Sequence, residues 1–159
     1  NYLKKIRNAG EKALIYCDFI KPLKLLETYL ISNKINVLTF KTDNDLTRFK
    51  NQSVTAILSG RRIAEGINLT MSNHIIFLSP PTQAVVRVQT LARASRIGQK
   101  KNVHVINLIT KNDGDSLEER ILKRLNEKIG KINCFLQKST ITLEEYRKAF
   151  EQINAKDVL

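Results

Sequence analysis

The 159-residue sequence lacks the features that mark a membrane-spanning, secreted or zinc-binding protein. Its two cysteines, Cys17 and Cys134, lie far apart without a Cys-x-x-Cys pattern or a nearby pair of histidines, which argues against a zinc site. No apolar run approaches the roughly 18 residues of a membrane span. Residues 1–5 lack the apolar core of a secretory signal. We therefore expect an intracellular protein with no membrane partner, in which both thiols stay reduced.

Acidic residues are scarce in the first two thirds of the chain. Residues 1–110 contain 17 Lys and Arg against 6 Asp and Glu, whereas residues 111–159 contain 10 against 9. The net charge of +12 is therefore concentrated in the first part. A polyanionic partner and an ordinary solvated basic surface both explain such a distribution.

The sequence also lacks the two motifs that most ATPases use to hold ATP and magnesium. No Gly-x-x-x-x-Gly-Lys-Ser/Thr loop occurs, and Gly98-Gln99-Lys100 is no substitute because no glycine precedes it at the required spacing. No Asp-Glu-x-His-like acid pair follows a predicted strand. We expect this chain alone to hydrolyse no appreciable ATP.

Short apolar runs alternate with segments of helical spacing. The pattern predicts strands at 13–17, 37–40, 55–58, 74–78 and 103–109, and helices at 22–30, 43–50 and 82–94. Asp43 or Asn44 is the expected cap of the second helix. Such alternation predicts the α/β class, with helices on both faces of a parallel sheet. Ligands of these sheets bind beyond the carboxyl ends of the strands, here the loops after Leu58, Leu78 and Ile109.

The C-terminal part has a different pattern. A capping box, Ser116-Leu117-Glu118-Glu119, opens one amphipathic helix, and Thr142-Leu143-Glu144-Glu145 opens a second that runs to residue 153. We predict a sheet domain over residues 1–111 and a helical extension over residues 112–159 that packs on it.

Arg93 and Arg96 are three residues apart, which predicts that both project from one face of a helix. Neighbouring guanidinium groups repel unless an anion lies between them, and a polyphosphate matches their geometry. In phosphoryl transfer, such arginines neutralise charge on the transferred group. A basic surface helix explains the same spacing. Neither arginine, nor the nearby Arg87, is expected to be needed for the helix to fold.

The segment 59–70 follows a predicted strand and contains glycines and arginines. Gly60 and Gly66 would let backbone N–H groups approach phosphates, Arg61 adds charge, and Asn68 could hydrogen-bond a ribose hydroxyl. Taken alone, the segment is more typical of a glycine-containing crossover loop, but its position after a strand and before the arginine-rich helix favours phosphate contacts.

These stretches resemble known motifs in their order along the chain. Residues 89–99 resemble motif VI of superfamily 2 helicases and, more narrowly, the Arg-Ala-x-Arg-Ile-Gly-Gln stretch of Swi/Snf-type DNA-dependent ATPases. Residues 59–70 resemble motif V, and residues 12–30 resemble motif IV, a strand followed by a helix. The resemblance covers residues 11–131 and implies the C-terminal RecA-like lobe of such an ATPase.

The resemblance also implies roles for individual residues. Arg93 and Arg96 would be the catalytic arginine fingers, Gln89, Gly66 and Asn68 would lie near the nucleotide, and Ser59, Gly60 and Arg61 would contact nucleic acid. ATP and Mg²⁺ would be bound mainly by an N-terminal RecA-like lobe in the same or another chain, and DNA would be the track, with RNA possible. No residue is expected to bind a metal. The alternatives are an inactive helicase-like module that binds nucleic acid or protein, and an unrelated α/β nucleotide-binding domain.

The sequence departs from the Swi/Snf pattern at several places. Ala64 and Glu65 stand where the family has paired glycines, Ala92 replaces the usual acid, and the Trp pair and Asn-Pro before motif VI are missing. These departures indicate a divergent member, such as one from a virus, phage or plasmid. The missing initiator Met favours a piece of a longer protein.

Overall fold

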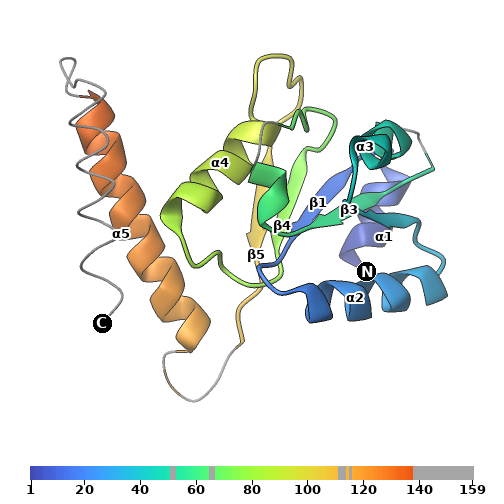
Figure 1. Cartoon of the computed structure of the whole chain (residues 1–159), viewed down its shortest axis with the longest axis horizontal. Coiled ribbons are helices and arrows are strands. Elements are labelled where there is room, and N and C mark those ends of the chain that lie inside the picture. The colour runs from blue at the N-terminus through green and yellow to red at the C-terminus, as the bar shows by residue number, and fades with distance from the viewer. Residues whose placement is uncertain (51–52, 65–66, 111–113, 115, 138–159) are drawn as a thin grey trace.

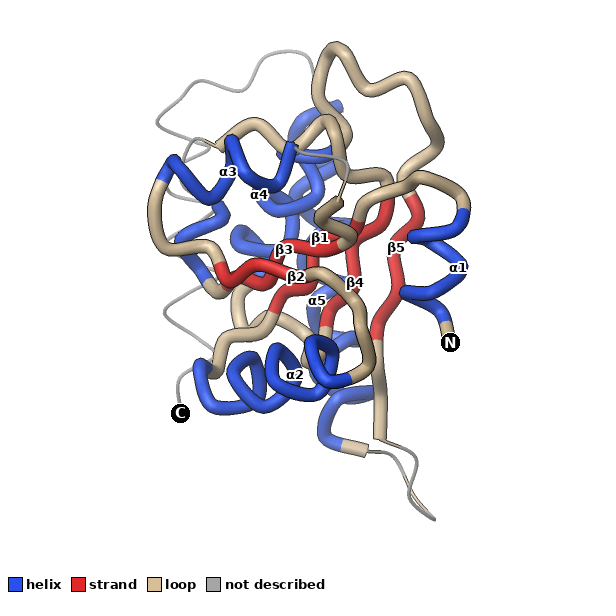
Figure 2. The backbone as a smooth tube through the Cα atoms, turned by 90° about the vertical axis from the view of Figure 1, so that its right-hand side faces the viewer, coloured by secondary structure: helices blue, strands red, loops and turns tan. Residues whose placement is uncertain are grey.

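The computed structural model describes residues 1–50, 53–64, 67–110, 114 and 116–137. Its centre is a five-stranded sheet in which every pair of neighbouring strands is parallel, in the order β2-β3-β1-β4-β5 (Figure 2). The strands are β1 (Ala13–Tyr16), β2 (Val37–Thr39), β3 (Ala56–Ser59), β4 (His74–Phe77) and β5 (His104–Asn107). Each predicted run overlaps one of them, so the predicted parallel α/β sheet is confirmed.

Helices cover both faces of the sheet, as predicted (Figure 1). They are α1 (Tyr2–Asn8), α2 (Ile20–Ser32), α3 (Asp43–Lys50), the short 3-10 helix η1 (Arg61–Ala64), α4 (Ala84–Ala94) and α5 (Leu117–Gln137). The helices α1 and α2 pack on one face, and α3, η1 and α4 pack on the other. The helix α1 was not predicted from sequence, because its seven residues bury only Ile6 and are too few to establish a helical period.

The strands are buried on both faces, which explains their continuous apolar runs. Alternate residues of β1 point to opposite sides: Leu14 and Tyr16 join one core cluster, and Ala13 and Ile15 join the other. The first cluster is completed by α3, η1 and α4 through Phe49, Ile63, Val86 and Ala94. The second is completed by α1 and α2 through Ile6, Leu23 and Leu30.

The predicted capping box at the start of α5 is confirmed. The N–H of Glu119 donates to Ser116 Oγ, and the N–H of Ser116 donates to Glu119 Oε2, each over 3.1 Å. The predicted cap of α3 is wrong, because the helix already begins at Asp43 and the carboxylate of Asp45 accepts the N–H of Thr42 over 2.9 Å. The helix α5 lies beside α4, whereas the second predicted helix, 142–153, falls outside the described residues.

The cysteines and the apolar character of the helices were the subject of two further predictions. Cys17 is a buried free thiol, and Cys134 belongs to the part of α5 whose side chains are not described. None of the helices in the described part of the chain is long and apolar enough to cross a membrane. The domain boundary between residues 111 and 112 stays a prediction.

Candidate functional site

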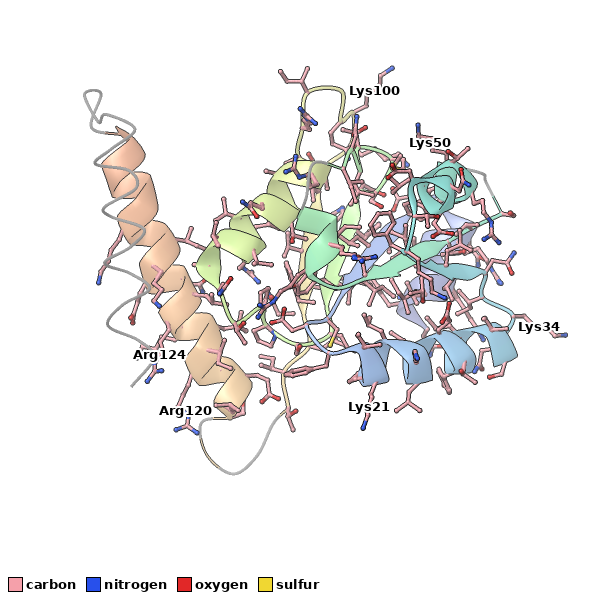
Figure 3. The ribbon with its side chains drawn as sticks, viewed as in Figure 1. Lys21, Lys34, Lys50, Lys100, Arg120 and Arg124 are labelled. Carbon is pink, nitrogen blue, oxygen red and sulfur yellow. The ribbon has the colours of Figure 1, made fainter. Side chains whose placement is uncertain are left out.

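The predicted site residues lie at two opposite edges of the sheet. Ser59 ends β3, so Ser59–Arg61 lie at the carboxyl edge, where the strands end. The N–H of Leu69 donates to the carbonyl of Arg93 over 3.1 Å, and the segment that holds Leu69 leads directly into the start of β4. Arg93 therefore lies at the amino edge, where the strands begin. In Figure 3, Lys21, in the first turn of α2 after β1, and Lys100, in the loop after α4, project from opposite sides of the molecule.

The predicted arginine pair therefore does not lie in the strand-following loops at the carboxyl edge, where the sheet rule alone would look for ligands. The helix α4 follows β4 and runs back along the sheet, so its last turn returns to the edge at which the strands start (Figure 1). The sheet rule concerns loops that follow strands. It does not apply to Arg93, in the last turn of α4, or to Arg96, in the turn after that helix.

At the carboxyl edge, Asp18 joins segments that follow three different strands. Its Oδ1 accepts hydrogen bonds from the Tyr16 hydroxyl at 2.7 Å and from Arg61 Nε at 3.2 Å. Its Oδ2 accepts the N–H of Thr82 at 3.1 Å and the Thr82 hydroxyl at 3.2 Å. Burial alone would raise the pKa of Asp18, but the hydrogen bonds from Tyr16, Thr82 and Arg61 outweigh it and lower the pKa. The charged carboxylate therefore holds the guanidinium of Arg61 in place through its Nε.

Arg61 keeps an exposed surface in spite of these contacts. Its Nη2 also donates to Thr82 Oγ1 over 3.1 Å, yet 57% of the side chain is exposed. An arginine held in place by a buried carboxylate can present its remaining N–H groups to a phosphate with little further ordering. Asp18 lies in the segment 12–30 that resembles motif IV. The structure shows that it orients Arg61.

Ser59 and Gly60 contribute in another way than the sequence suggested. Ser59 is only 2% exposed, and its hydroxyl donates to the carbonyl of Gly60 over 3.3 Å. A Cβ added at Gly60 would lie 3.3 Å from the carbonyl oxygen of Cys17, closer than a relaxed contact. The glycine thus allows the end of β3 to approach the end of β1. Of the three predicted nucleic-acid contacts, Arg61 is the one with an exposed side chain.

The amino edge carries the residues that sequence reasoning linked to the nucleotide. Asn68 is exposed, and its Oδ1 accepts the N–H of Thr70 over 3.1 Å in a local turn. Gln89 is exposed on α4 one turn before Arg93, so both lie on the same side of the helix. Gly66 lies outside the described residues.

The predicted placement of Arg93 and Arg96 on one helix face is wrong. The helix α4 ends at Ala94, and Ser95 is its C-cap, so Arg96 lies in the following turn and is exposed. Gln89 and Arg93 lie on the second half of α4 and Arg96 lies in the turn after it, while the backbone of Arg93 is hydrogen-bonded to Leu69, the neighbour of Asn68. Their grouping therefore depends on the loop after the helix and not on helical periodicity alone.

Arg87 is a structural residue, contrary to the expectation from sequence. It is 8% exposed, its Nη1 donates to Asn107 Oδ1 over 2.7 Å, and its guanidinium carbon lies 4.7 Å from the centre of the Phe77 ring. Burial lowers the pKa of Arg87. It ties α4 to β4 and β5 and so supports the helix that carries Gln89 and Arg93.

A polar cluster anchors the far end of the loop that follows α4. Glu11 Oε2 lies 2.6 Å from His74 Nε2, and Glu11 Oε1 lies 3.1 Å from the ammonium nitrogen of Lys101. The Tyr2 hydroxyl lies 2.9 Å from the other ring nitrogen of His74. Hydrogen bonds from His74 and then from Lys101 lower the pKa of Glu11 to about 2. The ionised carboxylate therefore holds Lys101 against the start of the sheet.

The free energy of unfolding should depend on pH because of the ionised carboxylate of Glu11. Because its pKa is lowered in the folded chain, its contribution is present above the ordinary carboxyl pKa of 4.5 and is lost as the pH falls toward 2. We expect Glu11→Gln to reduce the free energy of unfolding near neutral pH and to flatten its dependence on pH in this window. Urea unfolding followed by circular dichroism at several pH values measures both. Equal slopes in the two proteins would contradict this assignment.

Among the described residues, no three His, Cys, Asp or Glu side chains are grouped so that they could hold a metal ion. The predicted site residues with polar side chains at the two edges carry mainly guanidinium and amide groups instead. Such groups bind anions and nucleotide phosphates.

A parallel sheet flanked by helices, with Arg93 in the last turn of α4 and an exposed Arg96 directly after it, is the architecture of a RecA-like motor lobe. The model of the helicase conserved C-terminal domain matches residues 1–98. The chain belongs to this family, and it is the C-terminal lobe of a superfamily 2 helicase of the Swi/Snf type. The expected family is thereby confirmed.

Known proteins similar to the chain support this assignment. It is 34% identical over 142 residues to the chromatin-remodeling ATPase INO80 of Mus musculus, a match that covers 79% of this chain and 8% of the relative. It is 30% identical over 173 residues to the helicase SWR1 of Eremothecium gossypii, covering 99% of this chain and 11% of the relative. The crystal structure of the C-terminal part of the Fun30 ATPase domain superposes with a TM-score of 0.65 at 25% identity, covering 93% of this chain and 47% of that one. The chain thus spans about a tenth of the length of these curated relatives.

Proposed function

We propose that this chain is the second motor lobe of an ATP-dependent DNA translocase or helicase. An N-terminal RecA-like lobe, in the same or another chain, would bind ATP and Mg²⁺. Closure of the two lobes would bring Arg93 and Arg96 to the ATP phosphates, while the carboxyl edge around Arg61 would contact the phosphate backbone of DNA. The inactive binding module stays as the alternative, and RNA stays possible as the track.

The observation that carries the proposal is the group of Gln89, Arg93 and Arg96 on the second half of α4 and the turn after it, in which Gln89 and Arg96 are exposed and Arg93 is half-buried. Unlike Arg87, Arg96 has its side chain in solvent and ties no helix to the sheet. Guanidinium groups at this position can neutralise charge that develops on a transferred phosphoryl group. Mg²⁺ is assigned to the first lobe because the sequence contains no acid pair of the required kind. A module that only binds nucleic acid would need neither arginine.

The two edges of the sheet would bind different ligands, DNA at the carboxyl edge and ATP at the amino edge. The Asp18–Arg61–Thr82 network fixes a phosphate-binding group at the carboxyl edge, and the arginines that would reach ATP lie at the amino edge. ATP binding that closes the lobes would then shift the carboxyl edge relative to DNA held by the first lobe. Differential affinity of ATP for the closed state supplies the free energy of this shift.

The affinity for DNA should depend on the positive charge of Arg61, which would contact a phosphate of the backbone. In the full-length protein, Arg61→Ala is expected to weaken affinity for duplex DNA of any sequence and to reduce the slope of log affinity against log salt by about 0.9, the contribution of one phosphate contact. Fluorescence anisotropy of labelled duplexes over a salt series measures both. Arg7→Ala, which removes an exposed arginine from α1, is the matched control and should leave the slope unchanged. An unchanged slope in Arg61→Ala would remove Arg61 from the DNA contact.

A further inference from the structure

The side-chain amide of Gln99 joins three segments of the amino edge. Its Nε2 lies within hydrogen-bonding distance of three backbone carbonyls, those of Thr70 at 3.0 Å, Ser72 at 3.0 Å and Ala94 at 3.1 Å. Its Oε1 accepts the N–H of Lys101 over 3.0 Å. The two N–H groups of the amide are thus shared among three backbone carbonyls, and its oxygen accepts one backbone N–H.

The segments joined by Gln99 carry the residues assigned to the nucleotide. Thr70 and Ser72 belong to the segment that begins with Asn68, and Ala94 is the last residue of α4, next to Arg93. Backbone hydrogen bonds complete the connection. The N–H of Leu69 donates to the carbonyl of Arg93 over 3.1 Å, and the N–H of Gln99 itself donates to the carbonyl of Arg96 over 3.0 Å.

The tip of the loop projects, whereas its base is fixed. Ile97 is fully exposed, and Gly98 has φ of +104°, a conformation that side chains rarely adopt. The next residue is Gln99, whose side chain contacts the carbonyls of Thr70, Ser72 and Ala94. Without its amide, the loop that carries Arg96 would lose these side-chain hydrogen bonds to the sheet domain.

We propose that Gln99 is a positioning residue that holds Arg93 and Arg96 in the geometry required for ATP hydrolysis. The inference rests on the proposed function, because it assumes that these arginines act on ATP held by a first lobe. Fixing the loop before the lobes close removes the ordering entropy that a free loop would lose during catalysis. A displacement of about 1 Å in a catalytic group can reduce the rate about 100-fold. Gln99 itself need not touch the nucleotide.

The test uses Gln99→Glu in the full-length protein. The substitution keeps the shape of the side chain but replaces the donating amide with a carboxylate that faces three carbonyl oxygens. We expect kcat for DNA-stimulated ATP hydrolysis to fall about 100-fold, with KM for ATP and affinity for DNA unchanged. Gln83→Glu, the same chemical change at the exposed N-cap of α4, is the matched control and should keep wild-type kcat.

Thermal unfolding shows whether the variants stay folded. Gln99→Asn, which keeps the amide but shortens it by one methylene, is assayed in parallel, and both variants are measured well below their unfolding temperatures. We expect Gln99→Asn to lose kcat as well. Wild-type kcat in the two folded variants, or a matching loss in Gln83→Glu, overturns the proposal.

A double-mutant cycle separates positioning from other effects. If Gln99 acts through the arginines, adding Gln99→Glu to Arg96→Ala should reduce kcat much less than it does in the wild-type background. Equal losses in both backgrounds would mean that Gln99 acts independently of Arg96. Failure of the proposed function looks different, because the wild-type protein would then lack ATPase activity or Arg96→Ala would retain it.

Discussion

Replacing Arg96 with alanine in the full-length protein is expected to reduce kcat for DNA-stimulated ATP hydrolysis by about 10³-fold or more, and Arg93→Ala should do the same. Arginine fingers in phosphoryl transfer neutralise charge that appears only as the reaction proceeds, so their loss falls mainly on kcat. DNA affinity should stay at the wild-type level in both variants, because DNA is assigned to the opposite edge of the sheet. A coupled-enzyme ATPase assay and DNA anisotropy on the same samples measure the two quantities.

The matched control is Arg120→Ala, which removes an exposed arginine that projects from α5 (Figure 3). It should keep wild-type turnover. Near-normal turnover in Arg93→Ala or Arg96→Ala would show that the substituted residue is not an arginine finger. If the wild-type protein itself binds DNA but hydrolyses no ATP, the inactive binding module becomes the better description of the chain.

The sheet was predictable from sequence because its strands are buried on both faces. The run 13–17 is apolar throughout, and the structure divides Ala13, Leu14, Ile15 and Tyr16 between two core clusters. The capping box at Ser116 was equally readable, since both of its hydrogen bonds are local. In each case the decisive interactions repeat along the strand or lie within one helical turn.

The candidate site was less predictable because its contacts span long sequence distances. Asp18 orients Arg61 from 43 residues away, and Gln99 reaches carbonyls 27 and 29 residues back. Nothing in the local pattern around Gln99 signals these partners. The spacing of Arg93 and Arg96 even suggested a shared helix face, whereas the helix ends between them. Family resemblance identified the motif, and the structure shows which of its residues fix the others.

Arg87 illustrates the same limit, since three arginines in one segment looked alike in sequence. The structure separates them by burial: Arg87 is enclosed between α4, Phe77 and Asn107, and Arg96 is exposed. A guanidinium of the first kind stabilises the fold, and one of the second kind is free to act on a partner. We therefore expect Arg96→Ala to reduce kcat for ATP hydrolysis and Arg87→Ala to reduce the stability of the fold.

Arg87→Ala is expected to destabilise this chain by about 3 kcal/mol. A hydrogen bond from a charged donor contributes about 1.5–3 kcal/mol, and a desolvated cation over an aromatic ring contributes up to about 2 kcal/mol. Burial of the charge opposes both contributions, as the lowered pKa of Arg87 indicates. Urea unfolding should show a lower midpoint with an unchanged slope. Arg48→Ala, at a 66% exposed side chain paired with Asp45 at 3.5 Å, is the control and should change stability by less than about 1 kcal/mol.

The variant Arg87→Met tests whether the hydrogen bond and ring contact of Arg87 outweigh the cost of burying its charge. Methionine keeps packing volume beside Phe77 but carries no charge, so it removes the hydrogen bond to Asn107 and the burial penalty of the cation together. If the hydrogen bond and ring contact outweigh the burial penalty, Arg87→Met will be destabilised nearly as much as Arg87→Ala. A methionine variant as stable as wild type would show that the buried guanidinium contributes no net stability. Arg87 would then hold α4 in register with β4 and β5 without adding to the free energy of unfolding.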